Sequence, residues 1–165
     1  MNNYFDDFLN KGYSIQKVEN IKFIYEMQAI LEQKINYSDL ENIHKKYKFK
    51  EINNCRINCF REINKINDWE NKYFSIASSK LIDLLGPDIS IQNKLNLSIQ
   101  MPKDDSSILD LHTDALSGQS VFELVLWVPL TRSFKTNSMY IFSREKTKEI
   151  LNELKDKELD GMKVL

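Results

Sequence analysis

Apolar residues recur every three or four positions along the first half of the chain and at every second position along much of the second half. The first spacing is typical of a helix with one buried face, and the second of a β-strand with one buried face. The change of period falls near Gly86-Pro87, a pair suited to ending a helix. The pattern therefore predicts an α+β fold that is mainly helical over residues 1–86, β-rich over 87–142, and a helix and tail over 143–165.

Four helical segments are expected in this chain. The clearest covers residues 18–35 and places five apolar side chains on one face, at Ile21, Ile24, Met27, Leu31 and Ile35. The others are expected after a cap at Ser38 or Asp39, over residues 69–85, and from a cap at Ser143 to about residue 159.

Strands are expected in the second half wherever the period is two. These segments are residues 89–101, 108–111, 121–128 and 139–142. The segment 121–128 is apolar on both faces apart from Glu123, so we expect it to be a central strand.

Composition narrows the possible classes of protein. With 165 residues, of which 42% are hydrophobic and 28% charged, we expect one folded domain. Lys and Arg total 23 against 24 Asp and Glu, so there is no basic excess to favour a nucleic acid partner. Two cysteines, no signal-peptide pattern and no apolar run of roughly 18 to 20 residues predict a cytoplasmic protein without a membrane segment.

The strongest chemical feature is the triplet His112-Thr113-Asp114. In an extended chain residues i and i+2 point to the same side, so the imidazole and the carboxylate can reach one ion. One nitrogen and one hard oxygen suit an octahedral first-row metal such as iron(II). The alternative is a surface histidine that contacts a nearby carboxylate, and the spacing by itself leaves both interpretations open.

Two further groups could carry chemistry. Arg132 could contact an anion, although a solvated loop arginine is the simpler interpretation. Cys55 and Cys59 lie one helical turn apart and could chelate a metal. Because the chain has only two thiols and no histidine close by, we interpret both cysteines as core or half-buried residues.

The triplet also belongs to a longer series of motifs. In order these are NLSIQMP (96–102), LHTD (111–114), LWVPLT (126–131) and NSMYI (137–141). The series resembles the non-haem iron(II) and 2-oxoglutarate-dependent oxygenases, especially the phytanoyl-CoA dioxygenase-like branch. The stretches DDSS (104–107), SGQSVFE (117–123) and KTNSMY (135–140) resemble most closely the oxygenases of sporadic bacterial carbohydrate-biosynthesis clusters. The resemblance covers about residues 93–142.

This resemblance implies a double-stranded β-helix, or jelly-roll, preceded by helices that pack on one sheet. It also implies that His112 and Asp114 are two of three iron ligands, that 2-oxoglutarate is the cosubstrate, and that a small polar or carbohydrate-type metabolite is hydroxylated. Ser98 and Gln100 lie on the polar face of the expected strand and are candidate cofactor-binding residues, although a solvent-facing sheet surface is an equal alternative.

The chain departs from the family pattern after residue 142. The family has a distal histidine on a late strand, followed by an Arg or Lys for 2-oxoglutarate, whereas the other histidine here is His44 in a lysine-rich segment. We therefore expect a truncated chain with an incomplete barrel, which does not catalyse the reaction alone. The alternatives are a non-catalytic jelly-roll binding or interaction module and a metal protein completed by a partner. The sequence leaves the substrate and the oligomeric state open.

Overall fold

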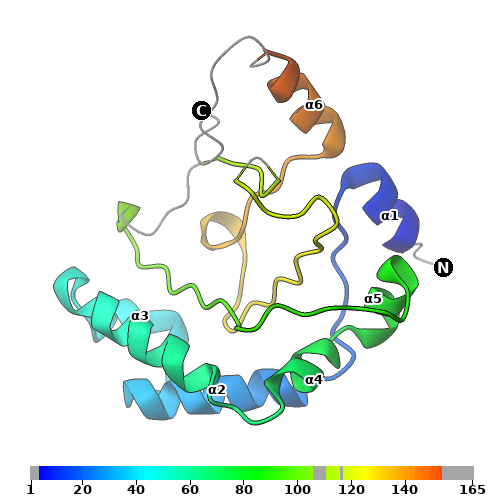
Figure 1. The fold of residues 1–165 in the computed structure, drawn as a ribbon. Helices are drawn as coiled ribbons and strands as arrows, with labels where there is room; N and C mark the ends of the chain where they lie inside the picture. The colour runs from blue at the N-terminus through cyan, green and yellow to red at the C-terminus, as the bar shows by residue number, and fades with distance from the viewer. Residues whose placement is uncertain (1–3, 106–110, 116, 154–165) are drawn as a thin grey trace. The chain divides into compact units, whose positions relative to one another are not determined.

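The structure is a computed structural model that describes residues 4–105, 111–115 and 117–153. In this part of the chain, helices are joined by irregular segments (Figure 1). The α-helices are α1 (Tyr4–Lys11), α2 (Lys22–Ile35), α3 (Phe49–Ile63), α4 (Trp69–Phe74), α5 (Ser78–Leu85) and α6 (Arg144–Glu153), and the 3-10 helices are η1 (Leu40–Lys45) and η3 (Lys135–Asn137).

The chain divides into two compact units, which are described separately. The core unit consists of Lys17–Ser107 and Pro129–Arg132, and the loop unit of Met1–Gln16, Ile108–Val128 and Ser133–Leu165. No helix in the described part of either unit is both long and apolar enough to cross a membrane.

Helices α2 and α3 form the centre of the core unit, where each buries one apolar face. The buried residues are Phe23, Ile24, Met27, Leu31 and Ile35 on α2 and Ile52, Cys55, Cys59 and Ile63 on α3. On both helices they recur at spacings of three and four, so each row lies along one side of its helix. Helix α2 ends at Asn36, whose φ of 52° is left-handed.

An irregular segment runs alongside α3 in place of the first expected strand. Leu95 and Met101 are buried and Leu97 and Ile99 are half-buried, while the residues between them are exposed. The backbone of this segment is held by side chains of the α3 region, since Arg56 Nε donates to the Ile99 carbonyl oxygen at 2.8 Å. The alternation therefore identifies the buried side of the segment, although the segment is not a strand.

The expected α+β class and the jelly-roll, or double-stranded β-helix, are wrong for the described residues, in which no β-strand occurs. The expected strands over 89–101, 121–128 and 139–142 are irregular, and residues 108–110 of the fourth lie outside the described part. An alternating sequence becomes a strand only where a neighbouring segment pairs with its backbone. Here α3 side chains take that role for the first segment, and the expected central strand leaves Val121 and Phe122 76% and 89% exposed.

The helices differ in detail from those expected. Helix α2 coincides with most of residues 18–35, whereas the segment 69–85 is broken into α4 and α5. Helix α3 was not anticipated as a separate helix, and residues 40–45 form only a 3-10 helix. Helix α6 begins after Ser143, whose Oγ accepts a hydrogen bond from the Lys146 backbone N–H at 3.3 Å.

Within the loop unit, α1 packs against α6. Gly12 follows α1 with a φ of +85°, and a Cβ at this position would lie 3.2 Å from Arg144 Cγ. Glycine at this position therefore permits both the left-handed turn and the close approach of the two helices.

Candidate functional site

The side chains of His112 and Asp114 approach each other in the loop unit. His112 Nε2 lies 3.4 Å from Asp114 Oδ1, and the side chains are 30% and 56% exposed. The pair is therefore partly covered on the histidine side and open to solvent on the aspartate side. The two side chains approach each other although residues 111–114 form no β-strand.

A hydrogen-bonded turn follows Asp114 directly and fixes its backbone. The Asp114 carbonyl oxygen accepts hydrogen bonds from the backbone N–H groups of Ser117 and Gln119 at 3.1 and 3.0 Å. Ser117 Oγ donates to the Thr113 carbonyl oxygen at 3.0 Å. Gly118, with a φ of +91°, supplies the left-handed residue of the turn. The acidic ligand candidate thus sits at the start of a locally constrained turn.

The spacing of the two donor atoms fits neighbouring positions around one octahedral ion. With ligands at about 2.1 Å, the value typical of Mg2+, neighbouring donors are about 3.0 Å apart. The observed 3.4 Å needs only a small side-chain movement to reach this separation. Among the described residues, no group of three or more His, Cys, Asp and Glu side chains is placed to hold a metal. Within the described residues, the geometry therefore brings together one imidazole and one carboxylate.

The two candidate cofactor-binding residues lie in the core unit and contact each other. Gln100 Nε2 donates to Ser98 Oγ at 2.9 Å, and both residues are exposed. They occupy the polar side of the segment whose other side packs on α3. Both are uncharged, so a carboxylate ligand would receive hydrogen bonds from them but no ionic partner.

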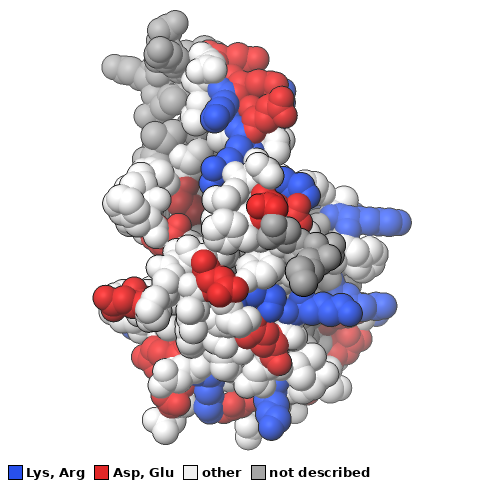
Figure 2. Space-filling model, turned by 90° about the vertical axis from the view of Figure 1, so that its right-hand side faces the viewer, with Lys and Arg blue, Asp and Glu red and all other residues white. Residues whose placement is uncertain are grey.

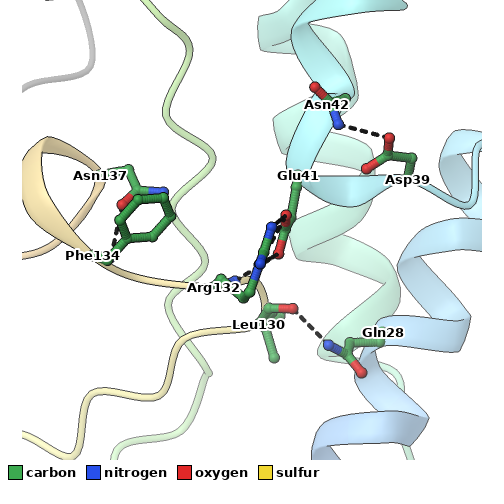
Figure 3. Close-up of polar contacts among 8 residues, drawn as sticks. All are labelled: Gln28, Asp39, Glu41, Asn42, Leu130, Arg132, Phe134 and Asn137. Atoms are coloured by element: carbon green, nitrogen blue, oxygen red, sulfur yellow. Dashed lines mark hydrogen bonds and ion pairs between the residues drawn. The ribbon is translucent and has the colours of Figure 1, made fainter.

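Arg132 is paired with a carboxylate of the same unit (Figure 3). Its Nε and Nη2 lie 3.0 and 3.2 Å from Glu41 Oε1 and Oε2, and its backbone N–H donates to Oε1 at 3.1 Å. Hydrogen bonds from the Arg132 side chain and backbone lower the pKa of Glu41. Gln28 Nε2 also donates to the Leu130 carbonyl oxygen at 2.6 Å. The anion that Arg132 contacts is thus a carboxylate of the same chain, and the pair is exposed, with the Arg132 side chain 80% accessible. Together with the Gln28–Leu130 hydrogen bond, the pair attaches residues 129–132 to α2 and η1.

Sequence reasoning did not identify Glu41 or Gln28 as partners of the LWVPLT motif. Glu41 and Arg132 are 91 residues apart, and no local pattern marks such a pair. His44, Lys48 and Lys50 are exposed and border a hollow in the core unit.

On the face drawn in Figure 2, acidic and basic side chains are interspersed and neither sign forms a continuous field.

No family model, curated protein or solved structure matches this chain.

Proposed function

We propose that this chain is an iron(II) and 2-oxoglutarate-dependent oxygenase-like protein in which His112 and Asp114 supply two of the protein ligands to the metal. The observation that supports the proposal is the 3.4 Å separation between His112 Nε2 and Asp114 Oδ1. The order of the surrounding motifs, which resembles that of the oxygenase family, supports it independently.

The donor set is chemically suitable. Imidazole nitrogen and carboxylate oxygen are the two ligand types of the facial triad that binds non-haem iron(II). Bound iron(II) would supply activation of dioxygen coupled to decarboxylation of 2-oxoglutarate, which side chains alone do not perform. His112 and Asp114 would position the ion, and the turn that begins at Asp114 would hold its carboxylate toward the imidazole. By the same resemblance, the oxidised substrate is a small polar or carbohydrate-type metabolite.

Two ligands give a weaker site than three, because every further ligand adds binding energy without a new loss of translational freedom. We therefore expect the isolated chain to bind divalent metal measurably but weakly and not to hydroxylate a substrate alone.

The experiment uses the two histidines of the chain as each other's reference. The ring-proton NMR signals of His112 and His44 are assigned with single His→Ala variants, and the full chain is titrated with Mn2+, whose paramagnetism broadens the signals of nearby protons. We expect the His112 signal to broaden at lower Mn2+ concentration than the His44 signal. Asp114→Asn should remove this difference, whereas Asp88→Asn, at an exposed aspartate of the core unit, should preserve it.

A second titration tests the oxygenase assignment separately from metal binding. Added 2-oxoglutarate should lower the Mn2+ concentration that broadens the His112 signal, because its keto and carboxylate oxygens chelate the same ion, whereas succinate should not. Equal broadening of the two histidines would overturn the metal site. If Mn2+ broadens the His112 signal equally with and without 2-oxoglutarate, the oxygenase proposal is overturned and a non-catalytic module is favoured.

A further inference from the structure

A hollow of roughly 750 Å³ opens in the core unit where η1 meets the start of α3. Its other wall is formed by Met101 and Pro102. All of these residues belong to one compact unit. The hollow is broadly open to solvent, so a bound ligand would stay partly exposed.

The wall is apolar on one side. Phe49, Met101 and Pro102 line it. Met101 is buried, whereas Phe49 is 53% exposed. An aromatic ring left half in solvent beside a hollow can gain further burial when an apolar group enters.

Basic side chains also border the hollow. His44, Lys48 and Lys50 border the hollow, and neither lysine forms an ion pair with any described residue. By contrast, the neighbouring Lys46 has a hydrogen-bond partner in the chain, since its Nζ donates to the Ile35 carbonyl oxygen at the end of α2. The two bordering lysines are thus cations that the folded chain leaves to solvent.

One carboxylate lines the hollow, that of Glu51. Its Oε2 accepts a hydrogen bond from the Lys48 backbone N–H at 3.3 Å, which caps the start of α3. The local charge therefore stays positive, with two lysines against one capping glutamate. A single carboxylate does not make a cation site, whereas two unpaired lysines beside an apolar wall favour an anion that carries an apolar body.

We propose that this hollow binds a small organic anion in which a flat apolar ring carries a phosphate or carboxylate group. The ring packs on Phe49 and Met101, and the anionic group lies between Lys48 and Lys50. None of the residues that line the hollow is His112 or Asp114, so a ligand could bind there whether or not the chain is an oxygenase.

The test uses 1-naphthyl phosphate as the probe, with 1-naphthalenemethanol and inorganic phosphate as its separated halves, and follows backbone amide signals of the full chain by NMR. We expect 1-naphthyl phosphate to shift the amides of residues 47–51 and 101, and each half to bind at least about tenfold more weakly, because ring burial and charge contribute together. A matching comparison with 1-naphthoate distinguishes phosphate from carboxylate as the preferred group.

Variants assign the binding to the named residues. Lys48→Gln/Lys50→Gln should weaken 1-naphthyl phosphate binding about tenfold and leave the neutral ring unaffected. The control Lys17→Gln/Lys22→Gln removes two exposed lysines elsewhere in the same unit and should change neither. Equal affinity for the neutral and charged probes, amide shifts confined to other residues, or absence of binding would each overturn the proposal.

Discussion

Asn64 hydrogen-bonds both backbone groups of Leu95. Its Nδ2 donates to the Leu95 carbonyl oxygen at 3.0 Å, and its Oδ1 accepts from the Leu95 N–H at 2.8 Å. A neighbouring β-strand would provide the same pair of bonds, so one amide side chain takes the place of a strand partner. Leu95 itself is buried, and its backbone therefore depends on this pairing.

Replacing Asn64 with alanine should destabilise the core unit by about 1–3 kcal/mol, because the buried Leu95 N–H and carbonyl groups lose their partner. Urea unfolding followed by circular dichroism measures the change, and amide hydrogen exchange at Leu95 should accelerate. Asn54→Ala alters an exposed asparagine on the same helix and should change stability by less than about 0.5 kcal/mol. Equal effects of the two substitutions would contradict the role assigned to Asn64.

The same region shows what the sequence could predict about the fold. The alternation of residues 95–101 correctly indicates which side is buried, because it depends only on local chain geometry. Strand formation depends on a partner elsewhere in the chain, and no local pattern reports whether that partner is present. The error was largest at residues 121–128, whose apolar character predicted a central strand although Phe122 is 89% exposed.

The helices follow a similar rule. Helix α2 was predicted because five apolar residues repeat at helical spacing along an unbroken segment. Helix α3 has the same signal in Ile52, Cys55, Cys59 and Ile63, but the polar residues around it obscured the pattern. The break between α4 and α5 has no comparable signal, since neither proline nor glycine occurs between Phe74 and Ser78.

At the candidate site too, the sequence predicts relations between nearby residues but not those between residues far apart in the chain. The i, i+2 spacing predicted that His112 and Asp114 lie on one side of the chain, and Nε2 and Oδ1 are 3.4 Å apart. This distance also fits a direct contact between imidazole and carboxylate, so metal binding stays a prediction. The assignment of Ser98 and Gln100 to cofactor binding relied on an expected sheet, and it stays a prediction. The pairing of Arg132 with Glu41 depends on tertiary structure and left no trace in the local sequence.

A buried ion pair connects α3 to the segment after Met101. Arg56 Nη2 lies 2.8 Å from Asp104 Oδ2, and the side chains are only 16% and 7% exposed. We expect Asp104→Asn to destabilise the core unit by about 2–4 kcal/mol, because it leaves the guanidinium buried without its countercharge. Urea unfolding measures the loss.

The neighbouring residue provides a matched control for this prediction. Asp105 is exposed, so Asp105→Asn should change the free energy of unfolding by less than about 0.5 kcal/mol. The double substitution Arg56→Met/Asp104→Leu removes both charges, but it also removes the hydrogen bond from Arg56 Nε to the Ile99 carbonyl oxygen, so it should recover only part of the stability lost in Asp104→Asn. A double variant as unstable as Asp104→Asn would contradict the role assigned to the unpaired guanidinium.

Glu19 should make the stability of the core unit depend on acidic pH. Desolvation raises the pKa of Glu19, but hydrogen bonds from Lys80, Ser79 and Ser78 outweigh it and lower the pKa from 4.5 to about 2. Because the folded-state pKa is the lower one, the stabilisation is complete above about pH 4.5 and is lost as the pH falls toward 2.

We expect Glu19→Gln to lower the free energy of unfolding by about 1 kcal/mol at pH 7. The effect is no larger because the carboxylate keeps contact with water, which screens its interactions. The difference from the unsubstituted chain should shrink between pH 4.5 and about 2. Glu70→Gln, at an exposed glutamate of α4, is the control and should change the free energy of unfolding at pH 7 by less than about 0.5 kcal/mol. Unfolding midpoints in urea across this range test the prediction, and a pH-independent difference for Glu19→Gln would contradict it.

The two thiols of α3 should resist alkylation in the folded chain. Cys59 is fully buried, and Cys55 Sγ lies 3.9 Å from its Sγ. Burial, with a smaller contribution from Cys55, raises the pKa of the Cys59 thiol to about 12. Since the thiolate is the reactive form, iodoacetamide at pH 8 should label Cys59 on the order of a thousandfold more slowly than an exposed thiol.

Asn54→Cys places such a thiol on the same helix as an internal reference, and mass spectrometry of peptides compares the two rates. Unfolding in urea should equalise them, whereas equal labelling without urea would show that the α2–α3 interface does not enclose Cys59.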